Sequence, residues 1–187
     1  MEMSCGRGGG ANYLAKHLKP SLFVAVDRQA SSILFCRKTY SAENLRFVCA
    51  DALSTPFADN TFDAVINVEA SHNYPNMGGF LSEVKRVLRP GGHLLYTDYR
   101  RRQKFDRWQR ELGRSGLRII EKEDITDNVV RALEHSNDNT RSVVRRNAPW
   151  FLRSFFRQFA GVKGSDIYKA FDARRMTYMR YVLRKDG

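Results

Sequence analysis

Short apolar runs alternate with amphipathic segments along the first half of the chain. Each apolar run ends at a polar residue or a turn, which is typical of a buried strand. Such runs predict strands over residues 22–26, 45–50, 62–68 and 93–97. Apolar residues at helical spacing predict helices over residues 30–40 and 80–88. Repeated strand–helix units of this kind predict a parallel sheet with helices on both of its faces.

The pattern changes after Asp98. It predicts a helix over residues 105–112, a strand over 117–121 and a final strand over 176–184. Residues 128–176 are helical in pattern, basic and aromatic, with the run Trp150–Phe159 at their centre. We expect this insertion to form a helical lid.

A glycine-rich segment opens the chain as Glu2-Met-Ser-Cys-Gly-Arg-Gly-Gly-Gly10. Glycine has no Cβ and tolerates positive φ, so such a turn lets the backbone approach a ligand closely. Asp27 ends the next apolar run, about 20 residues later, where nucleotide-binding sheets hold a ribose diol. The chain therefore predicts a site for an adenosine-containing cofactor. Because Gly6-x-Gly8-x-x-Ala11 also matches the dinucleotide fingerprint, both NAD(P) and S-adenosylmethionine fit this loop.

Several acids stand where the predicted strands end. Parallel strands joined by right-handed crossovers point the same way, so their carboxyl ends share one edge of the sheet. That edge would gather Gly6–Gly10, Asp27, Asp51, Glu69 and Asp98. We expect a ligand to bind there.

The first strand is incomplete. A glycine turn of this type follows a buried strand of about five residues, whereas only residues 1–4 precede Cys5. We expect a chain truncated at its N-terminus, or one whose first strand is completed by a partner or an added segment.

Composition narrows the class of protein. A chain of 187 residues with 42% hydrophobic content can build one domain with its own core. Three cysteines without metal-type spacing predict reduced thiols, no metal site and a cytoplasmic location. No apolar stretch reaches the roughly 18 residues of a transmembrane helix, and no signal peptide is visible.

The net charge is +12, from 32 Lys and Arg against 20 Asp and Glu. Such a balance fits contact with nucleic acid, an anionic membrane or an acidic substrate. The basic residues gather in Arg100–Arg110 and in Arg141–Arg157. A solvated basic face is the plainest interpretation of both clusters.

Three further segments resemble successive motifs of a known family. Asp51-Ala52, Pro56–Val65 and Val87–Leu95 are similar to motifs of the class I S-adenosylmethionine-dependent methyltransferases, in the methyltransferase type 11 group. The resemblance covers about residues 2–98. It implies S-adenosylmethionine as the cofactor. It also implies an α/β fold, a Rossmann-like, doubly wound, mostly parallel sheet of seven strands, with an incomplete first strand and an antiparallel last one.

The same resemblance implies roles for single residues. Glu2 and the glycine loop would hold the methionine part, and Asp27 would accept hydrogen bonds from the ribose hydroxyls. Asp51 would accept one from the adenine amino group. Ser4 departs from the glycine that is usual at this position. The implied cofactor contacts are Glu2, Ser4, Gly6, Gly8, Asp27, Asp51, Ala52, Asn67 and Glu69.

Within the family, Ser4–Ala11, Ile66–Pro75 and the ending from Ser165 are similar to bacterial phthiotriolone-type lipid and natural-product O-methyltransferases. This resemblance implies methyl transfer to a hydroxyl of a lipophilic small molecule or lipid. His72 follows the fourth strand. Because histidine is the side chain best suited to take up a proton near neutral pH, we predict that His72 is the general base. The residues predicted to line the acceptor pocket are Tyr74, Trp150 and Phe155.

We expect one methyltransferase domain over residues 1–187. It would have a cofactor-binding core over 1–127, an acceptor lid over 128–176 and a final strand over 177–187. Two alternatives stay open: an NAD(P)-dependent oxidoreductase, and a relative without catalytic activity. The predicted partner is a lipophilic acceptor, with peripheral membrane contact left open. Nucleic acid is disfavoured, because no Asn-Pro-Pro-Tyr type motif for a flipped base follows the fourth strand.

Overall fold

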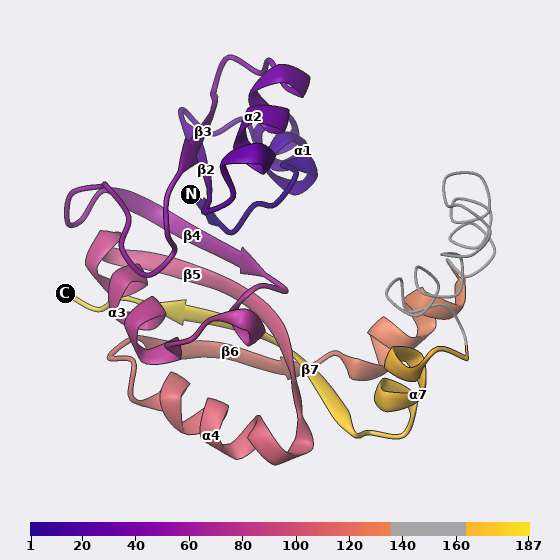
Figure 1. Cartoon of the computed structure of the whole chain (residues 1–187). Helices are drawn as coiled ribbons and strands as arrows, with labels where there is room; N and C mark the ends of the chain where they lie inside the picture. Colours follow the sequence, from indigo (N-terminus) through magenta and orange to yellow (C-terminus); the bar gives the residue numbers. More distant parts are fainter. Residues whose placement is uncertain (136–163) are drawn as a thin grey trace. The chain divides into compact units, whose positions relative to one another are not determined.

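Seven strands form one sheet in the computed structural model, which describes residues 1–135 and 164–187 (Figure 1). Their order across the sheet is β3-β2-β1-β4-β5-β7-β6. The strands are β1 (Glu2–Met3), β2 (Phe23–Asp27), β3 (Leu45–Cys49), β4 (Phe62–Val68), β5 (Leu88–Arg101), β6 (Arg118–Asp124) and β7 (Met176–Arg184). The helices are α1 (Gly9–Leu18), α2 (Ala30–Thr39), η1 (Ser71–Asn73), α3 (Met77–Val87), α4 (Arg102–Gly113) and α7 (Asp166–Asp172), and residues 126–135 are also helical.

The predicted fold class is confirmed. β1 to β5 pair in parallel, and the last strands run antiparallel. In β2 every residue from Phe23 to Val26 is buried, as expected for a parallel strand that is covered on both faces.

The short strand β1 lies in the middle of the sheet. Glu2 pairs with Ala25 of β2 on one side and with Ile66 of β4 on the other. The amide of Cys5 extends the pairing by donating to the Val26 carbonyl (2.9 Å). A strand of two residues thus joins the two halves of the sheet and carries the glycine loop at its end.

Helix α1 was missed by the sequence pattern, since its first residues are Gly9 and Gly10, which disfavour helix interiors. Tertiary packing forms it nonetheless. Its buried residues Ala11 and Ala15 lie in a core cluster with residues of α2, β2 and β3. The buried members of that cluster are Cys5, Ala11, Ala15, Phe23, Ala25, Ile33, Cys36, Leu45 and Phe47.

Helix α3 begins three residues earlier than predicted, because Asn76 caps it by accepting a hydrogen bond from the Gly79 amide (2.9 Å). Its buried face includes Phe80, Val84 and Val87, at the predicted helical spacing. Val87 is its last residue, close to the predicted end at residue 88.

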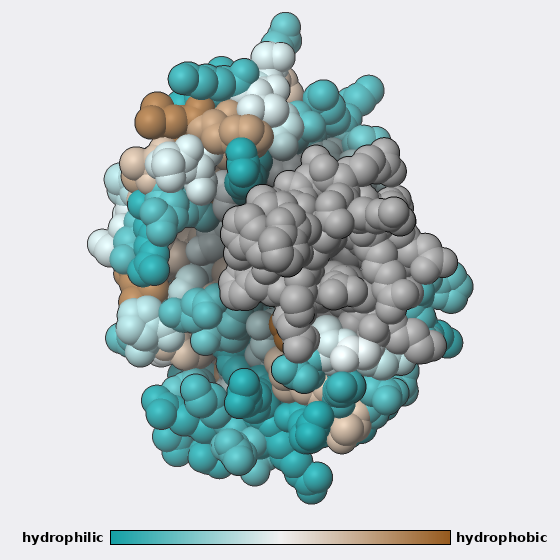
Figure 2. Space-filling model, turned by 45° about the vertical axis from the view of Figure 1, so that its right-hand side comes forward, coloured by the Kyte–Doolittle hydropathy of each residue, from teal (hydrophilic) through white to brown (hydrophobic). Residues whose placement is uncertain are grey.

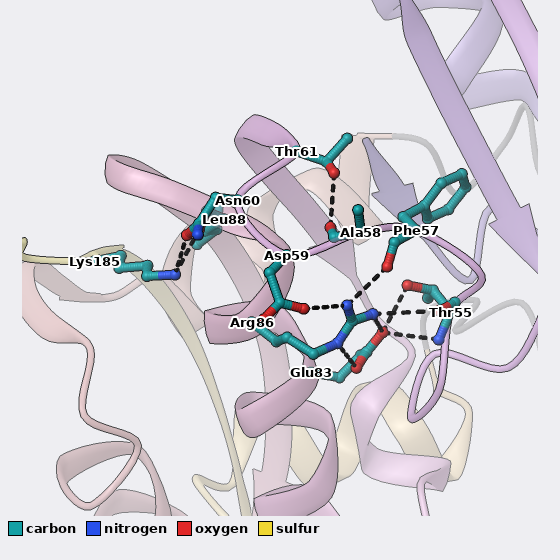
Figure 3. A network of polar contacts seen from close by, with 10 residues as sticks. All are labelled: Thr55, Phe57, Ala58, Asp59, Asn60, Thr61, Glu83, Arg86, Leu88 and Lys185. Carbon is teal, nitrogen blue, oxygen red and sulfur yellow. Dashed lines mark hydrogen bonds and ion pairs between the residues drawn. The ribbon is translucent and has the colours of Figure 1, made fainter.

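A buried carboxylate ties the loop before β4 to this helix (Figure 3). Glu83 Oε1 accepts hydrogen bonds from the amide and the hydroxyl of Thr55 (2.8 and 2.6 Å) and from Arg86 (2.7 Å). Arg86 also donates to Asp59 and to the Phe57 carbonyl (2.8 and 2.7 Å). Burial raises the pKa of Glu83, but these hydrogen bonds outweigh it and hold that pKa at about 2. The carboxylate therefore stays ionised and holds the loop.

Strand β5 is longer than predicted. The segment 89–92, which lies between the predicted helix and the predicted strand, forms a bulge within β5: Phe62 pairs with Leu88 and Ala64 with His93. Gly91 has φ +81°. The strand also continues past Asp98 to Arg101.

By its contacts the chain divides into two compact units. The first comprises Met1–Asp98, Gln109–Lys122 and Tyr181–Gly187, and the second Tyr99–Trp108 and Glu123–Arg180.

In the second unit Phe171, Met176 and Tyr178 form a small buried cluster. The Arg100 guanidinium lies over the ring of Trp108, 4.6 Å from its centroid. In such a cation–π contact the guanidinium stays charged and is attracted to the face of the aromatic ring.

Hydrophilic residues cover much of the described surface in Figure 2, with smaller hydrophobic patches between them. Among residues 1–135 and 164–187, no helix is long and apolar enough to cross a membrane.

Candidate active site

A cavity of about 290 Å³ opens in the first unit, at the carboxyl ends of the parallel strands. It is lined by Ser4, Asp27, Arg28, Gln29, Asp51, Ala52, Leu53, Glu69, Ala70, Asn73, Tyr74 and Pro75. Of the residues that the sequence placed along one edge, Asp27, Asp51 and Glu69 therefore meet around one cavity, whereas Gly6–Gly10 and Asp98 are not in its lining. Six of the residues singled out from the sequence line it, namely Ser4, Asp27, Asp51, Ala52, Glu69 and Tyr74.

The glycine loop forms the turn between β1 and α1. Gly6 and Gly8 have φ values of +54° and +73°, in the left-handed region that favours glycine. A Cβ on Gly8 would lie 2.8 Å from both Cys36 Sγ and the Phe47 ring, whereas one on Gly6 would meet nothing within 4 Å. Gly8 is thus required by packing as well as by backbone conformation, and Gly6 by conformation alone.

Asp27 fastens this loop to the end of β2. Its Oδ2 accepts from the Gly6 amide (2.8 Å), and its Oδ1 accepts from the Gln29 amide (2.9 Å). A carboxylate has about four acceptor positions, so both oxygens keep capacity for a ligand in the cavity. Gln29 is the N-cap residue of α2, so Asp27 also fastens the start of that helix.

Three buried side-chain oxygens have no hydrogen-bond partner among the described residues: Oδ1 of Asn12 in α1, Oε2 of Glu2 in β1 and Oδ1 of Asn67 in β4. Glu2 and Asn67 are the most buried of these residues, 8% and 0% exposed. Burial raises the pKa of Glu2 to about 7. Unpaired buried acceptors are costly and rare in folded proteins, so the oxygens of Glu2 and Asn67 are suited to receive donors from a ligand.

Asp51 and Glu69 lie at the rim of the cavity. Asp51 Oδ1 accepts from the Leu53 amide (2.9 Å), which leaves its second oxygen available to a ligand. Ala52 beside it is buried. Glu69 has φ +49°, and its amide donates to the Thr97 carbonyl (2.9 Å). An acidic residue in this sparsely populated conformation is typical of a functional site.

Tyr74 lines the cavity, but its hydroxyl is already engaged. It lies 2.5 Å from Ser4 Oγ and accepts from Asn67 Nδ2 (2.9 Å). Asn67 Nδ2 also donates to the Met3 carbonyl (3.0 Å). The residue predicted to face the acceptor is therefore joined to two residues predicted to face the cofactor.

His72 is paired with a buried acid that the sequence did not single out as a site residue. The Nδ1–H of His72 donates to Asp98 Oδ1 (2.8 Å), and the His72 amide donates to Asp98 Oδ2 (2.9 Å). Ser71 Oγ donates to the same Oδ2 (2.7 Å). Asp98 is 0% exposed, whereas the His72 side chain is 20% exposed.

This pairing settles which ring nitrogen of His72 is the acceptor. With the proton on Nδ1, the other nitrogen, Nε2, carries a lone pair; Asn73 Nδ2 donates to it (2.8 Å). The tautomer follows from the hydrogen-bond network. The sequence placed Asp98 at the ligand edge, but it did not predict the pairing of Asp98 with His72.

Other predicted site residues fall outside this description. Trp150 and Phe155 lie outside the described residues. Within residues 1–135 and 164–187, no group of three or more His, Cys, Asp or Glu side chains is placed to hold a metal ion.

Known proteins resemble the chain along its whole length. The family described as the methyltransferase domain matches residues 1–96. The phthiotriol/phenolphthiotriol dimycocerosates methyltransferase of Mycobacterium leprae is 39% identical over 186 residues, covering all of this chain and 69% of the relative. The fatty-acid O-methyltransferase of Mycolicibacterium smegmatis is 44% identical over 159 residues, covering 85% of this chain and 58% of the relative.

Solved structures share the fold. A phosphoethanolamine N-methyltransferase of Haemonchus contortus, in complex with S-adenosylhomocysteine, has a TM-score of 0.82 at 16% identity, over 100% of this chain and 48% of that one. The geranyl diphosphate C-methyltransferase of Streptomyces coelicolor, also with S-adenosylhomocysteine, has a TM-score of 0.73 at 15% identity, over 98% of this chain and 69% of that one.

The family match covers half of the chain, and the relatives are similar well beyond that half. The oxidoreductase alternative is therefore wrong. The chain belongs to the methyltransferase domain family and is an S-adenosylmethionine-dependent methyltransferase.

Proposed function

We propose that the protein transfers a methyl group from S-adenosylmethionine to a hydroxyl of a lipophilic small molecule or lipid. The observation that supports a hydroxyl acceptor is the His72–Asp98 pair, in which Nδ1 donates to a buried carboxylate (2.8 Å). Nε2 is then the acceptor nitrogen; it accepts from Asn73 Nδ2 here and would accept from the substrate hydroxyl in its place. A hydroxyl must lose its proton as it is methylated, and a histidine oriented by an acid is suited to take it.

The residues around the cavity fit the cofactor. The unpaired oxygens of Glu2 and Asn67 would accept from its ammonium group, and the glycine loop would hold the methionine part. Asp27 would accept from the ribose hydroxyls. Asp51 would accept from the adenine amino group, with Ala52 beside the ring and Glu69 near the sulfonium.

When bound, S-adenosylmethionine supplies an electrophilic methyl group on a positively charged sulfur. His72 Nε2 would accept the proton that the acceptor hydroxyl loses as it is methylated. Asp98 stabilises the imidazolium that results and keeps the ring in its orientation. The protein otherwise contributes alignment, since displacement at a methyl carbon is governed by proximity and orientation of the two reactants.

The lipophilic nature of the acceptor is supported by two relatives, which are named as methyltransferases of phthiotriol/phenolphthiotriol dimycocerosates and of fatty acids. Tyr74, Trp150 and Phe155 would line the acceptor pocket. A cavity of about 610 Å³ in the second unit supports peripheral contact with anionic lipid, since its lining includes four arginines: Arg101, Arg102, Arg174 and Arg175.

The first test is binding followed by turnover. Calorimetric titration with S-adenosylmethionine should give saturable binding, and Asp27→Ala should weaken it by about 1–3 kcal/mol because it leaves hydroxyl donors unpaired. Methyl transfer from labelled S-adenosylmethionine should then be measured with long-chain alcohols and with the matching alkanes. We expect label in the alcohols only.

The base is tested by two variants in the same assay. His72→Ala should lower kcat on the order of 10²–10⁴-fold. Asp98→Asn should lower it too and change the pH dependence of the rate, whereas Asp63→Asn, at an exposed acid, should change neither. Binding without transfer to any hydroxyl would instead identify a relative without catalytic activity. Transfer at full rate by His72→Ala would exclude this histidine from the mechanism.

A further inference from the structure

Three side chains from separate parts of the first unit meet at one hydroxyl. Ser4 follows β1, Asn67 lies in β4 and Tyr74 is the residue directly after η1. The Tyr74 hydroxyl is 2.5 Å from Ser4 Oγ and 2.9 Å from Asn67 Nδ2. Its ring packs edge-on against Phe80, with centroids 5.0 Å apart. Burial raises the pKa of Tyr74, so its hydroxyl stays protonated at neutral pH.

Ser4 has a backbone conformation that would suit glycine better. Its φ of +62° lies in the left-handed region, where an L side chain is sterically disfavoured. Glycine would adopt the same φ without that cost. The serine therefore brings a steric penalty that the glycine would avoid, and the visible gain is the hydrogen bond to Tyr74.

The turn that carries His72 is consequently held from both sides. On one side Asp98 of β5 accepts from Ser71 Oγ and from the His72 amide (2.7 and 2.9 Å). On the other side, two residues after His72, the Tyr74 hydroxyl is bound to the cofactor loop through Ser4. Asp98 also accepts from the His72 ring at Nδ1, which sets the tautomer. The contact on the Tyr74 side connects the turn to the loop that would hold the cofactor.

We propose that Ser4 and Tyr74 are a pair of positioning residues that set the place of His72 relative to the cofactor loop. The pair does not touch the reacting atoms; it acts through the turn that carries the base. This inference rests on the proposed function, because it assigns His72 the role of base and the loop the role of cofactor site.

A bond that is merely structural would affect folding stability and nothing else. A positioning bond has a different signature. Misplacement of a base lowers kcat, since small displacements at a reacting centre can cost up to about 10²-fold in rate. It leaves the titration of His72 unchanged, because Asp98 still holds Nδ1. It also leaves most cofactor affinity in place, because Asp27 and Glu2 are untouched.

The experiment is a double-mutant cycle of Ser4→Ala, Tyr74→Phe and the double variant. Ser4→Gly is a further variant, which removes the steric cost of the positive φ at this position. Ser31→Ala and Tyr13→Phe are matched controls, because both residues are exposed on helices. We expect each single variant to lower kcat on the order of 10-fold, and the double variant to lower it no further. Ser4→Gly should lose rate like Ser4→Ala, while its stability equals or exceeds that of wild type.

A second readout does not depend on activity. The ring resonances of His72 should be followed by NMR against pH in the protein without cofactor. In Ser4→Ala and Tyr74→Phe these resonances should move while their titration midpoint stays that of wild type. In Asp98→Asn the midpoint itself should change.

Two results would overturn the inference. One is an additive loss of kcat in the double variant; the other is an unchanged His72 spectrum in both single variants. Failure of the proposed function looks different, since wild type would then methylate no hydroxyl acceptor while the NMR arm would still report whether the pair positions the ring.

Discussion

Asp98 is fully buried and receives two hydrogen bonds from His72 and one from Ser71. His72 and Asp98 are distant in the sequence. His72 lies in the turn that follows β4, and Asp98 lies in the neighbouring strand β5. Val68 at the end of β4 pairs with Thr97, the residue before Asp98. The histidine could be predicted as a base from its type and position. Its orientation depends on a partner that only the register of β4 and β5 places beside it.

Glu2 illustrates how burial changes a single carboxyl group. Its pKa is raised to about 7 in the folded protein, from 4.5 for an exposed group. If its unpaired oxygen receives the ammonium of the cofactor, the charged form is favoured and binding should strengthen as the pH rises through 7. We expect wild type to bind S-adenosylmethionine on the order of 10-fold more tightly at pH 8 than at pH 6, beyond any dependence seen in Glu2→Gln.

Stability supplies the control for this prediction. A raised carboxyl pKa stabilises the fold fully below 4.5, and that contribution is lost as the pH rises through about 7. Without cofactor, wild type should therefore lose stability between pH 5 and pH 8 relative to Glu2→Gln, in urea unfolding. Equal pH dependence of binding in the two proteins would remove Glu2 from the cofactor site.

Among the elements, the loop from β1 to α1 has the strictest sequence requirement. The glycine spacing predicted that a ligand approaches this backbone, and the positive φ values of Gly6 and Gly8 agree with that prediction. The helix that follows was not predicted, because paired glycines at its start disfavour a helix and only packing against β2 and β3 stabilises it. Local propensity was thus overridden by tertiary contact.

Two alanine substitutions in this loop should separate packing from conformation. Gly8→Ala combines positive φ with a Cβ 2.8 Å from Cys36 Sγ and Phe47, so it should reduce the free energy of unfolding by on the order of 3 kcal/mol. Gly6→Ala meets open space and should cost only the backbone term, about 1 kcal/mol. Denaturant unfolding of both variants measures the difference. Equal losses would show that Cys36 and Phe47 accommodate the methyl group.

At the scale of the whole molecule, the fold does not explain why the chain carries such a high positive net charge. The net charge is +12, and arginines of the second unit line one cavity. Arg174 is already paired with Asp124 and Asp127 (3.0 and 2.7 Å), so Arg101, Arg102 and Arg175 are the better candidates to meet anionic lipid. The ionic strength sets the distance over which the charges of such an exposed cluster attract an anionic surface.

Cosedimentation with phosphatidylglycerol vesicles tests this contact. Replacement of Arg101 and Arg102 by Glu should release the protein from the vesicles, and so should raising the salt concentration from about 0.1 M to about 1 M. Lys16→Glu with Lys38→Glu makes the same change in net charge on exposed helix positions and should bind much more like wild type. Equal release by both pairs would mean that net charge alone, rather than the arginine-lined cavity, attracts the protein to lipid.

The sequence by itself determined the alternation of strands and helices and the family, and it predicted the edge of the sheet where we expect the ligand. These depend on local periodicity, on glycine conformation and on motifs that are contiguous in the chain. The dinucleotide fingerprint could not decide between two cofactors, because the loop serves both; the motifs that follow were needed.

Only the tertiary structure decided which side chains act together. Strand register and turn geometry form the pairs Ser4–Tyr74 and His72–Asp98. Neither the register nor the turn geometry can be predicted from a local segment of the sequence. The orphaned oxygens of Glu2 and Asn67 likewise depend on burial, which is a property of the packed sheet. A hydrogen bond between distant residues requires their elements to be placed within a few tenths of an ångström, and packing alone provides that placement.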